Sequence, residues 1–185
     1  MRPMKHLAPS LLAGLALVSA QGAQAQQACI EPADLDDTIR YAIPILYDAT
    51  MTTCADQYAP DGFMMRDGEA FADSFRALQS EAWPGTVRVI QTFAAGDEEG
   101  DDLIASMLTA MPEDTLRPFV DTLVTQMVSE EIKPDTCGKI ERALELIAPL
   151  PPENVSGLVT FIVEQVRPDD PQLCGIEPKK ETAAE

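Results

Sequence analysis

The strongest constraint on the fold of this chain is a set of apolar stripes with helical spacing, separated from one another by prolines. The clearest stripe begins at Val155 and continues at i+3, i+4, i+7, i+8 and i+11, which is the repeat of one helix face. Pro152 and Glu153 precede the stripe and Pro168 follows it, as is typical of helix ends. We therefore predict an amphipathic helix between the two prolines.

A second stripe lies just before this helix and predicts its antiparallel partner. Asp135 is the expected N-cap of the second helix, and Pro149 marks its expected end. Its apolar residues are Cys137, Ile140, Leu144 and Ile147. Because only residues 149–152 separate the two helices, they should fold back on each other as an αα-hairpin over residues 136–167.

Another hairpin is expected over residues 101–130. The chain should turn at residues 112–115, and Pro118 then falls in the first turn of the return helix, where proline is tolerated. The apolar residues of the two helices are Leu103, Ile104, Met107, Leu108 and Met111, followed by Leu116, Phe119, Val120, Leu123, Val124 and Met127.

A third hairpin is expected over residues 69–95, with its turn at residues 83–86. Its stripes are formed by Phe71, Phe75, Leu78 and Ala82, and then by Val87, Ile90 and Phe93. Residues 86–90 also have the composition of a strand, but the helical pattern of their neighbours favours a helix.

The N-terminal third is less regular. We expect a helix over residues 34–47, interrupted or kinked at Pro44, and a turn-rich connection over residues 55–68. A chain of 185 residues is long enough to bury a core, so we predict one all-α domain over residues 26–177. Its architecture is either an irregular helical bundle or a short stack of three αα-hairpins, linked by disulfides, and the polar residues 178–185 form a disordered tail.

Residues 1–25 have the features of a cleaved secretory signal peptide. Arg2 and Lys5 precede an uncharged apolar stretch that is too short to span a membrane, and residues 23–25 have the small-x-small pattern of a cleavage site. Removing Arg2 and Lys5 leaves 11 basic against 31 acidic residues, a formal charge of −20. The mature protein is therefore predicted to be periplasmic or secreted, without a transmembrane segment.

The chain has an even number of cysteines, which in an oxidising compartment predicts two structural disulfides. The four residues are Cys29, Cys54, Cys137 and Cys174. No CxxC motif is present, which argues against a thiol-redox site. In the antiparallel hairpin over residues 136–167, the start of one helix lies near the end of the other, so we expect the pairs Cys137–Cys174 and Cys29–Cys54.

The exported chain is expected to lack histidine, because His6 leaves with the signal peptide. Histidine is the usual general base near neutral pH and a common metal ligand. Its absence excludes Ser-His-Asp and Cys-His catalysis and histidine-ligated zinc. We accordingly predict no catalytic residue and no cofactor.

Two groups of residues could nevertheless bind a metal. An acidic run beside Gly100 is a calcium candidate, because calcium prefers several carboxylate oxygens, but a solvated loop with a helix cap is the alternative. This run consists of Asp97, Glu98, Glu99, Asp101 and Asp102. Copper could bind thioether sulfur, but the methionines within the stripes are explained by core packing. Met107, Met111 and Met127 lie within the stripes, whereas Met64 and Met65 fall in the turn-rich segment, where burial is favoured over a binding lip. The methionines considered for copper are Met51, Met64, Met65, Met107, Met111 and Met127.

The excess of acidic residues argues against binding to nucleic acid, which needs a basic surface. We therefore expect a non-enzymatic binding module whose partner is another envelope protein, and the negative charge favours a basic one. One alternative is a carrier that holds an apolar small molecule between amphipathic helices. A third possibility is a hydrolase that uses two carboxylates. The carboxylates considered for it are Asp36, Asp37, Asp56, Asp61, Asp67, Glu69 and Glu81.

Overall fold

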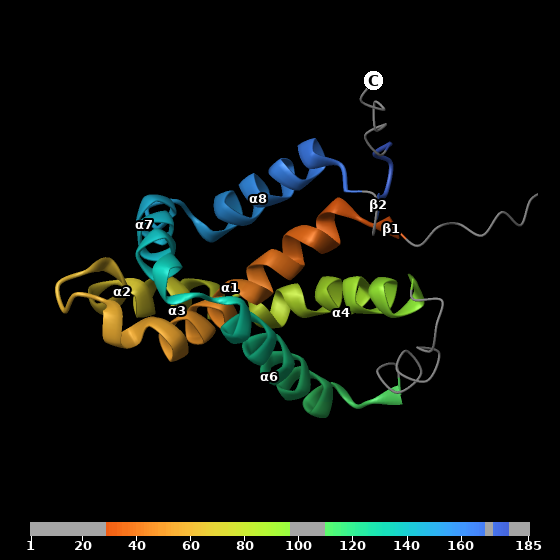
Figure 1. The fold of residues 1–185 in the computed structure, drawn as a ribbon. Helices are drawn as coiled ribbons and strands as arrows, with labels where there is room; N and C mark the ends of the chain where they lie inside the picture. Colours follow the sequence, from red (N-terminus) through yellow and green to blue (C-terminus); the bar gives the residue numbers. More distant parts are fainter. Residues whose placement is uncertain (1–28, 97–109, 169–171, 178–185) are drawn as a thin grey trace, which may run out of the picture.

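The computed structural model describes residues 29–96, 110–168 and 172–177, and all its long elements are helices (Figure 1). The prediction of an all-α chain with two disulfides is confirmed. The predicted signal peptide, the acidic run at 97–102 and the C-terminal tail lie outside the described residues.

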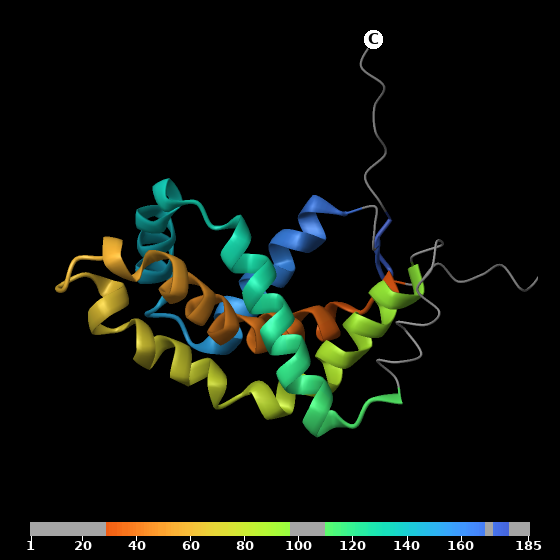
Figure 2. The ribbon, with the colours of Figure 1, turned by 60° about the horizontal axis from the view of Figure 1, so that its bottom comes forward.

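Helix α1 (Pro32–Cys54) is the element on which most of the longer helices pack. It continues past the predicted end at residue 47, with Pro44 buried inside it. The hydroxyls of Thr50, Thr52 and Thr53 donate to carbonyls four residues earlier, so the polar end of the helix satisfies its hydroxyls locally. Figures 1 and 2 show α1 crossing the middle of an irregular bundle. It contacts α3 (Gly68–Arg76), α4 (Gln79–Gly96), α6 (Glu113–Glu131) and α8 (Pro152–Val166).

The predicted hairpin over residues 69–95 is wrong in the position of its turn. Helix α3 (Gly68–Arg76) ends and α4 (Gln79–Gly96) begins before that position, so Pro84 lies inside α4. The neighbouring Gly85 packs so closely on α1 that a β-carbon would clash with the Asp37 carboxylate. Packing against α1 thus keeps α4 continuous although proline lacks the N–H for one helical hydrogen bond. Residues 86–90 are helical, as predicted.

Helices α6 (Glu113–Glu131), α7 (Cys137–Ile147) and α8 (Pro152–Val166) lie close to their predicted positions. A short 3₁₀ helix, η3 (Pro134–Thr136), precedes α7, so Thr136 stands at the N-cap position in place of the predicted Asp135.

The antiparallel packing predicted for α7 and α8 is wrong. The chain from η3 to the end of α7 and the chain of α8 are bent by 117° at the break between them. Pro151 has an extended backbone (φ −57°, ψ 147°) that carries the chain away from α7. Helix α7 instead contacts α2 (Phe63–Arg66), which follows η2 (Ala55–Gln57) in the predicted turn-rich connection, and α8 contacts α1.

A short parallel pairing joins the two ends of the described chain. Strands β1 (Cys29–Ile30) and β2 (Gln172–Leu173) contain two residues each, and the sequence analysis did not predict them. Ile30 and Leu173 are buried together with Val89 of α4. A pairing between two-residue segments so far apart leaves no periodic pattern that could be recognised in the sequence.

The predicted disulfide pairing is also wrong. The structure contains Cys29–Cys174 and Cys54–Cys137 in place of Cys137–Cys174 and Cys29–Cys54. The prediction required an antiparallel hairpin over residues 136–167, and because α7 and α8 diverge, the two expected partners are not brought together. In the chain-entropy model each observed disulfide contributes about 4–5 kcal/mol, since each closes a long loop.

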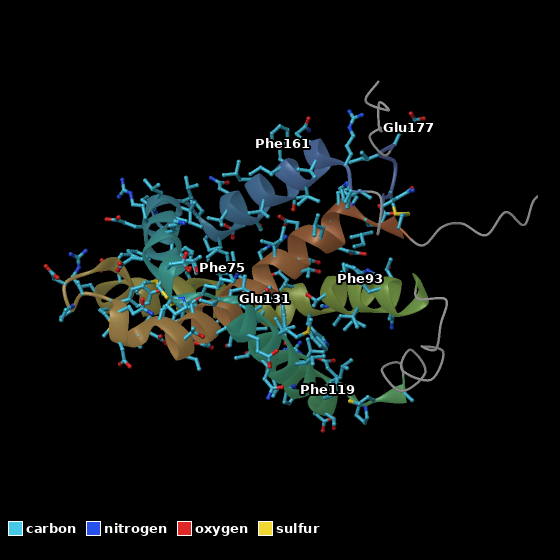
Figure 3. The ribbon with its side chains drawn as sticks, in the orientation of Figure 1. Phe75, Phe93, Phe119, Glu131, Phe161 and Glu177 are labelled. Carbon is cyan, nitrogen blue, oxygen red and sulfur yellow. A yellow bond between two sulfur atoms is a disulfide. The ribbon has the colours of Figure 1, made fainter. Side chains whose placement is uncertain are left out.

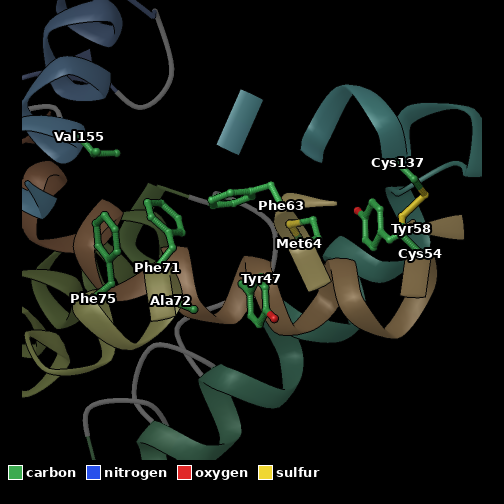
Figure 4. Close-up of a cluster of buried hydrophobic side chains, with 10 residues drawn as sticks. All are labelled: Tyr47, Cys54, Tyr58, Phe63, Met64, Phe71, Ala72, Phe75, Cys137 and Val155. Carbon is green, nitrogen blue, oxygen red and sulfur yellow. A yellow bond between two sulfur atoms is a disulfide. The ribbon is translucent and has the colours of Figure 1, made fainter. Parts of the chain in front are cut away.

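The core is divided into clusters that share α1. The first cluster contains the Cys54–Cys137 disulfide (Figure 4) and consists of Tyr47, Cys54, Tyr58, Phe63, Met64, Phe71, Ala72, Phe75, Cys137 and Val155. The second lies between α1, α4 and α6 and consists of Tyr41, Ile45, Ala82, Trp83, Leu116 and Val120. Each cluster therefore depends on side chains from helices far apart in the sequence.

Candidate interaction surfaces

A group of acidic and guanidinium side chains lies at the start of α1, beside α4. Arg88 of α4 donates to both carboxylate oxygens of Asp34, at 2.9 and 2.6 Å, and Arg40 pairs with Asp36 and Asp37. Burial raises the pKa of Asp37, although the charge of Arg40 opposes the shift. Each carboxylate has a guanidinium partner, so the arrangement is an ion-pair network that joins α1 to α4.

The other five carboxylates considered for hydrolysis are all exposed. Two of them have arginine partners: Asp67 pairs with Arg66, and Glu69 pairs with Arg76. Among the residues that the structure describes, no three acidic, cysteine or histidine side chains are placed to hold a metal ion. The calcium candidate at 97–102 lies outside those residues.

A buried tyrosine lies beside the disulfide of the first cluster. The Tyr58 hydroxyl is buried without a hydrogen-bond partner, and burial, together with the nearby charge of Glu141, raises its pKa to about 12. Glu141 also accepts a hydrogen bond from the Met64 backbone N–H at 3.1 Å, which ties α7 to the start of α2. At neutral pH Tyr58 therefore stays protonated, and its ring packs in the first cluster.

Helix α6 is fixed to the core by its inward side. Leu116 and Val120 are buried in the second cluster. The Tyr41 hydroxyl of α1 donates to Asp121 at 2.7 Å, and the Arg117 guanidinium lies over the Trp83 ring, 4.9 Å from its centroid. Apolar burial and directed polar contacts thus hold α6 in one orientation.

The outward side of α6 carries a row of large apolar side chains, which we call the α6 row. It consists of Phe119, Leu123 and Met127, at i, i+4 and i+8, and they are between 44% and 60% exposed. Glu130 and Glu131 follow in the last turn, which contains no basic residue. The C-terminal end of a helix carries a partial negative charge, and the two carboxylates add to it. Because the last turn contains no basic residue, this end of the row is negatively charged.

Helix α8 contributes Val155 and Val163 to the core, and its inward side is otherwise formed by small and polar side chains. Ser156 is fully buried, Thr160 is 7% exposed and Glu164 is half-buried, and the three recur at i, i+4 and i+8. The Ser156 hydroxyl donates to the Glu153 carbonyl, whereas the Thr160 hydroxyl has no partner. Small side chains allow α8 to lie close to α1, and Val155 anchors its N-terminal end in the first cluster.

The outward side of α8 is apolar, and we call it the α8 face. Its large side chains are Leu158, Val159, Phe161, Ile162 and Val166, which are 37% to 62% exposed. Most of the stripe that predicted this helix is therefore at the surface and not in the core. Figure 3 shows Phe161 on the side of α8 away from α1, whereas Phe119 lies on α6 across the bundle.

No protein-family model, curated protein or solved structure matches this chain. Among the described helices, none alone is long and apolar enough to cross a membrane; α7 and α8 reach that length and hydropathy only as a bent pair. The α6 row and the α8 face are the places on the described surface where one helix exposes three or more large apolar side chains.

Several methionines were expected in the core from the spacing of the apolar stripes. Met127 is 60% exposed, so its assignment to the core is wrong, while Met64 is buried and the adjacent Met65 is exposed. Met111 is half-buried against the second cluster, as its stripe predicted, and Met107 lies outside the described residues. The spacing of residues 156, 160 and 164 could have indicated from the sequence that the opposite side of α8 packs closely against the core.

Proposed function

We propose that this protein is a non-enzymatic binding module of the periplasm or cell envelope, and that the α6 row binds another envelope protein. One observation carries the proposal. Phe119, Leu123 and Met127 are exposed on a helix whose other side is fixed to the core, so the row is presented in a defined orientation. Rigid presentation of apolar side chains lowers the entropy that binding must overcome.

The chemistry at the end of the α6 row favours a basic partner. Glu130 and Glu131 lie three and four residues after Met127, at the negative end of the helix dipole. A complementary segment would place apolar side chains on the row and Lys or Arg beside the two carboxylates. The negative charge of the whole chain would attract the same partner from a distance and make the encounter sensitive to salt.

Two further features support a location outside the cytoplasm. The described chain contains two disulfides and no free cysteine, which is typical of proteins from oxidising compartments. The predicted signal peptide at residues 1–25 agrees with this location. Because the proposed location is the periplasm or cell envelope, the partner is sought in envelope extract.

The proposal is tested by capturing partners from envelope extract with the immobilised mature protein at low and high salt. Wild type should retain a protein at low salt and release it at high salt. Leu123→Ser/Met127→Ser should lose it through the missing anchors, and Glu130→Lys/Glu131→Lys should lose it through reversed charge. Asp56→Lys/Asp61→Lys, which makes the same change in charge at exposed positions elsewhere, should retain it. Equal capture by all four proteins would disprove the role of the α6 row.

A further inference from the structure

The α8 face differs from the α6 row because it carries no charge. Besides its apolar side chains, the outward side of the helix contains only Asn154, Gly157 and Gln165, all exposed. The helix has two carboxylates: Glu153 is exposed in the first turn and Glu164 is half-buried, and by helical spacing both lie on the side of Thr160 and away from the α8 face. An uncharged apolar surface on a strongly acidic protein has no feature that selects a basic partner.

We propose that the α8 face binds a second copy of this chain, as an antiparallel pair of α8 helices related by a two-fold axis. Two copies that meet here bring no like charges together at the contact, although the rest of each chain is strongly acidic. A two-fold contact uses the same surface on both copies, so the face must be complementary to itself.

The two amides of the face provide this complementarity. Asn154 and Gln165 are eleven residues apart, which is close to three helical turns, so both lie along the same edge of the face. In an antiparallel pair, Asn154 of one copy lies opposite Gln165 of the other, and the reverse pair forms at the other end. Side-chain amides donate and accept hydrogen bonds, so each pair can satisfy itself. The same register places Leu158 opposite Phe161 of the second copy.

The size of the face agrees with a dimer contact. Its five large apolar side chains together expose on the order of 400 Å², which is in the range of the largest apolar patch on a monomer. A standard interface buries roughly 800 Å² on each partner, a little more than half of it apolar. The α8 face therefore supplies the apolar part of one such interface.

Salt separates this contact from the one proposed for α6. Screening weakens the attraction between Glu130, Glu131 and a basic partner, but it reduces the repulsion between two acidic copies. Association through the α8 face should therefore become tighter as salt is added, and capture through the α6 row should become weaker. The two contacts use different helices, so either can fail without the other.

The test is sedimentation equilibrium of the mature protein over a range of concentrations at low and high salt. A reversible dimer is expected, tighter at high salt. Phe161→Glu should weaken it by at least about tenfold, because the contact would bury unpaired carboxylates. Phe93→Glu on α4, the same substitution at a phenylalanine with similar exposure, should leave the dimer unchanged. A monomer at all concentrations, or a dimer insensitive to Phe161→Glu, would overturn the proposal.

The antiparallel register has its own test. Asn154→Glu alone should weaken the dimer by a few-fold, because each new carboxylate would lie at the contact opposite an uncharged Gln165, whereas the double variant Asn154→Glu/Gln165→Lys should restore it by placing opposite charges together. Failure of the double variant to recover affinity would refute the register. Binding of a persistently monomeric protein to phosphatidylcholine vesicles, abolished by Phe161→Glu, would assign the α8 face to a lipid surface and also refute the dimer.

Discussion

Helices α6 and α8 both pack on α1 and both expose apolar side chains, yet they face the core in opposite ways. Helix α6 turns Leu116 and Val120 inward and keeps Phe119 and Leu123 outside as an additional row. Helix α8 turns small and polar side chains inward and most of its large apolar side chains outward. The difference shows that an apolar stripe indicates a helix but does not specify which side of it the core covers.

The orientation of α8 follows from how its ends are held. At its N-terminal end Val155 lies in the first cluster, and beyond its C-terminal end β2 pairs with β1 next to the Cys29–Cys174 disulfide. Between these two attachments, Ser156 and Thr160 allow a close approach to α1. These attachments leave the α8 face exposed in a single copy of the chain. In the proposed dimer the same face would be buried.

The largest expected effect comes from removing a buried contact on the inward side of α6. Leu116→Ala should lower the free energy of unfolding by about 2–4 kcal/mol, because it deletes buried methyl groups and leaves a cavity in the second cluster. Leu158→Ala on the α8 face should change it by less than about 0.5 kcal/mol in dilute solution, where the chain is monomeric. Urea denaturation of the two variants measures both values. Equal losses would contradict the orientation of α8.

The sequence was sufficient to predict the last three helices. The stripes place α6, α7 and α8 close to their observed bounds, because helical periodicity and proline are local signals. The turn at residues 83–86 was predicted wrongly for the opposite reason. There the local signal of Pro84 and Gly85 indicates a break, but packing of Gly85 against Asp37 keeps α4 continuous.

The pairing of the cysteines and the exposed surfaces could not be predicted, because both depend on contacts between distant segments. Cys54 meets Cys137 only because α7 starts beside the end of α1, and Cys29 meets Cys174 only through the pairing of β1 with β2. Likewise, Met127 has the spacing of a core residue, and only the packing of α6 on α1 shows that it is outside. The candidate surfaces are therefore found where the predicted stripe and the observed burial disagree.

A smaller effect is expected from the hydrogen bond that fixes α6 to α1. Tyr41→Phe should lower the free energy of unfolding by about 1–2 kcal/mol, because half-buried Asp121 loses the donor that lies at 2.7 Å. Thr125→Val on the same helix serves as the control, because its hydroxyl donates only within the helix, to the Asp121 carbonyl. An unchanged stability in Tyr41→Phe would show that directed polar contacts do not distinguish α6 from α8.

The same tyrosine predicts a dependence on alkaline pH. Burial, followed by the hydrogen bond to Asp121, raises the pKa of Tyr41 above its ordinary value of 10.0. The folded state thus keeps this proton where the unfolded state loses it. The stabilisation is complete below pH 10 and decreases as pH rises above that value. The free energy of unfolding should fall more steeply above this pH in wild type than in Tyr41→Phe, and parallel curves would contradict the buried position of Tyr41.

The smallest effect, and the only one of opposite sign, is expected on the inward side of α8. Thr160→Val replaces a buried hydroxyl that has no hydrogen-bond partner with a methyl group of similar size, so it should raise the free energy of unfolding by up to about 1 kcal/mol. Thr50→Val on α1, where the buried hydroxyl donates to the Leu46 carbonyl, should bring no such gain. A loss of stability in Thr160→Val would mean that the hydroxyl is satisfied in solution. The inward side of α8 would then be stabilised by polar contacts, as α6 is, and the contrast between the two helices would be confined to their outward sides.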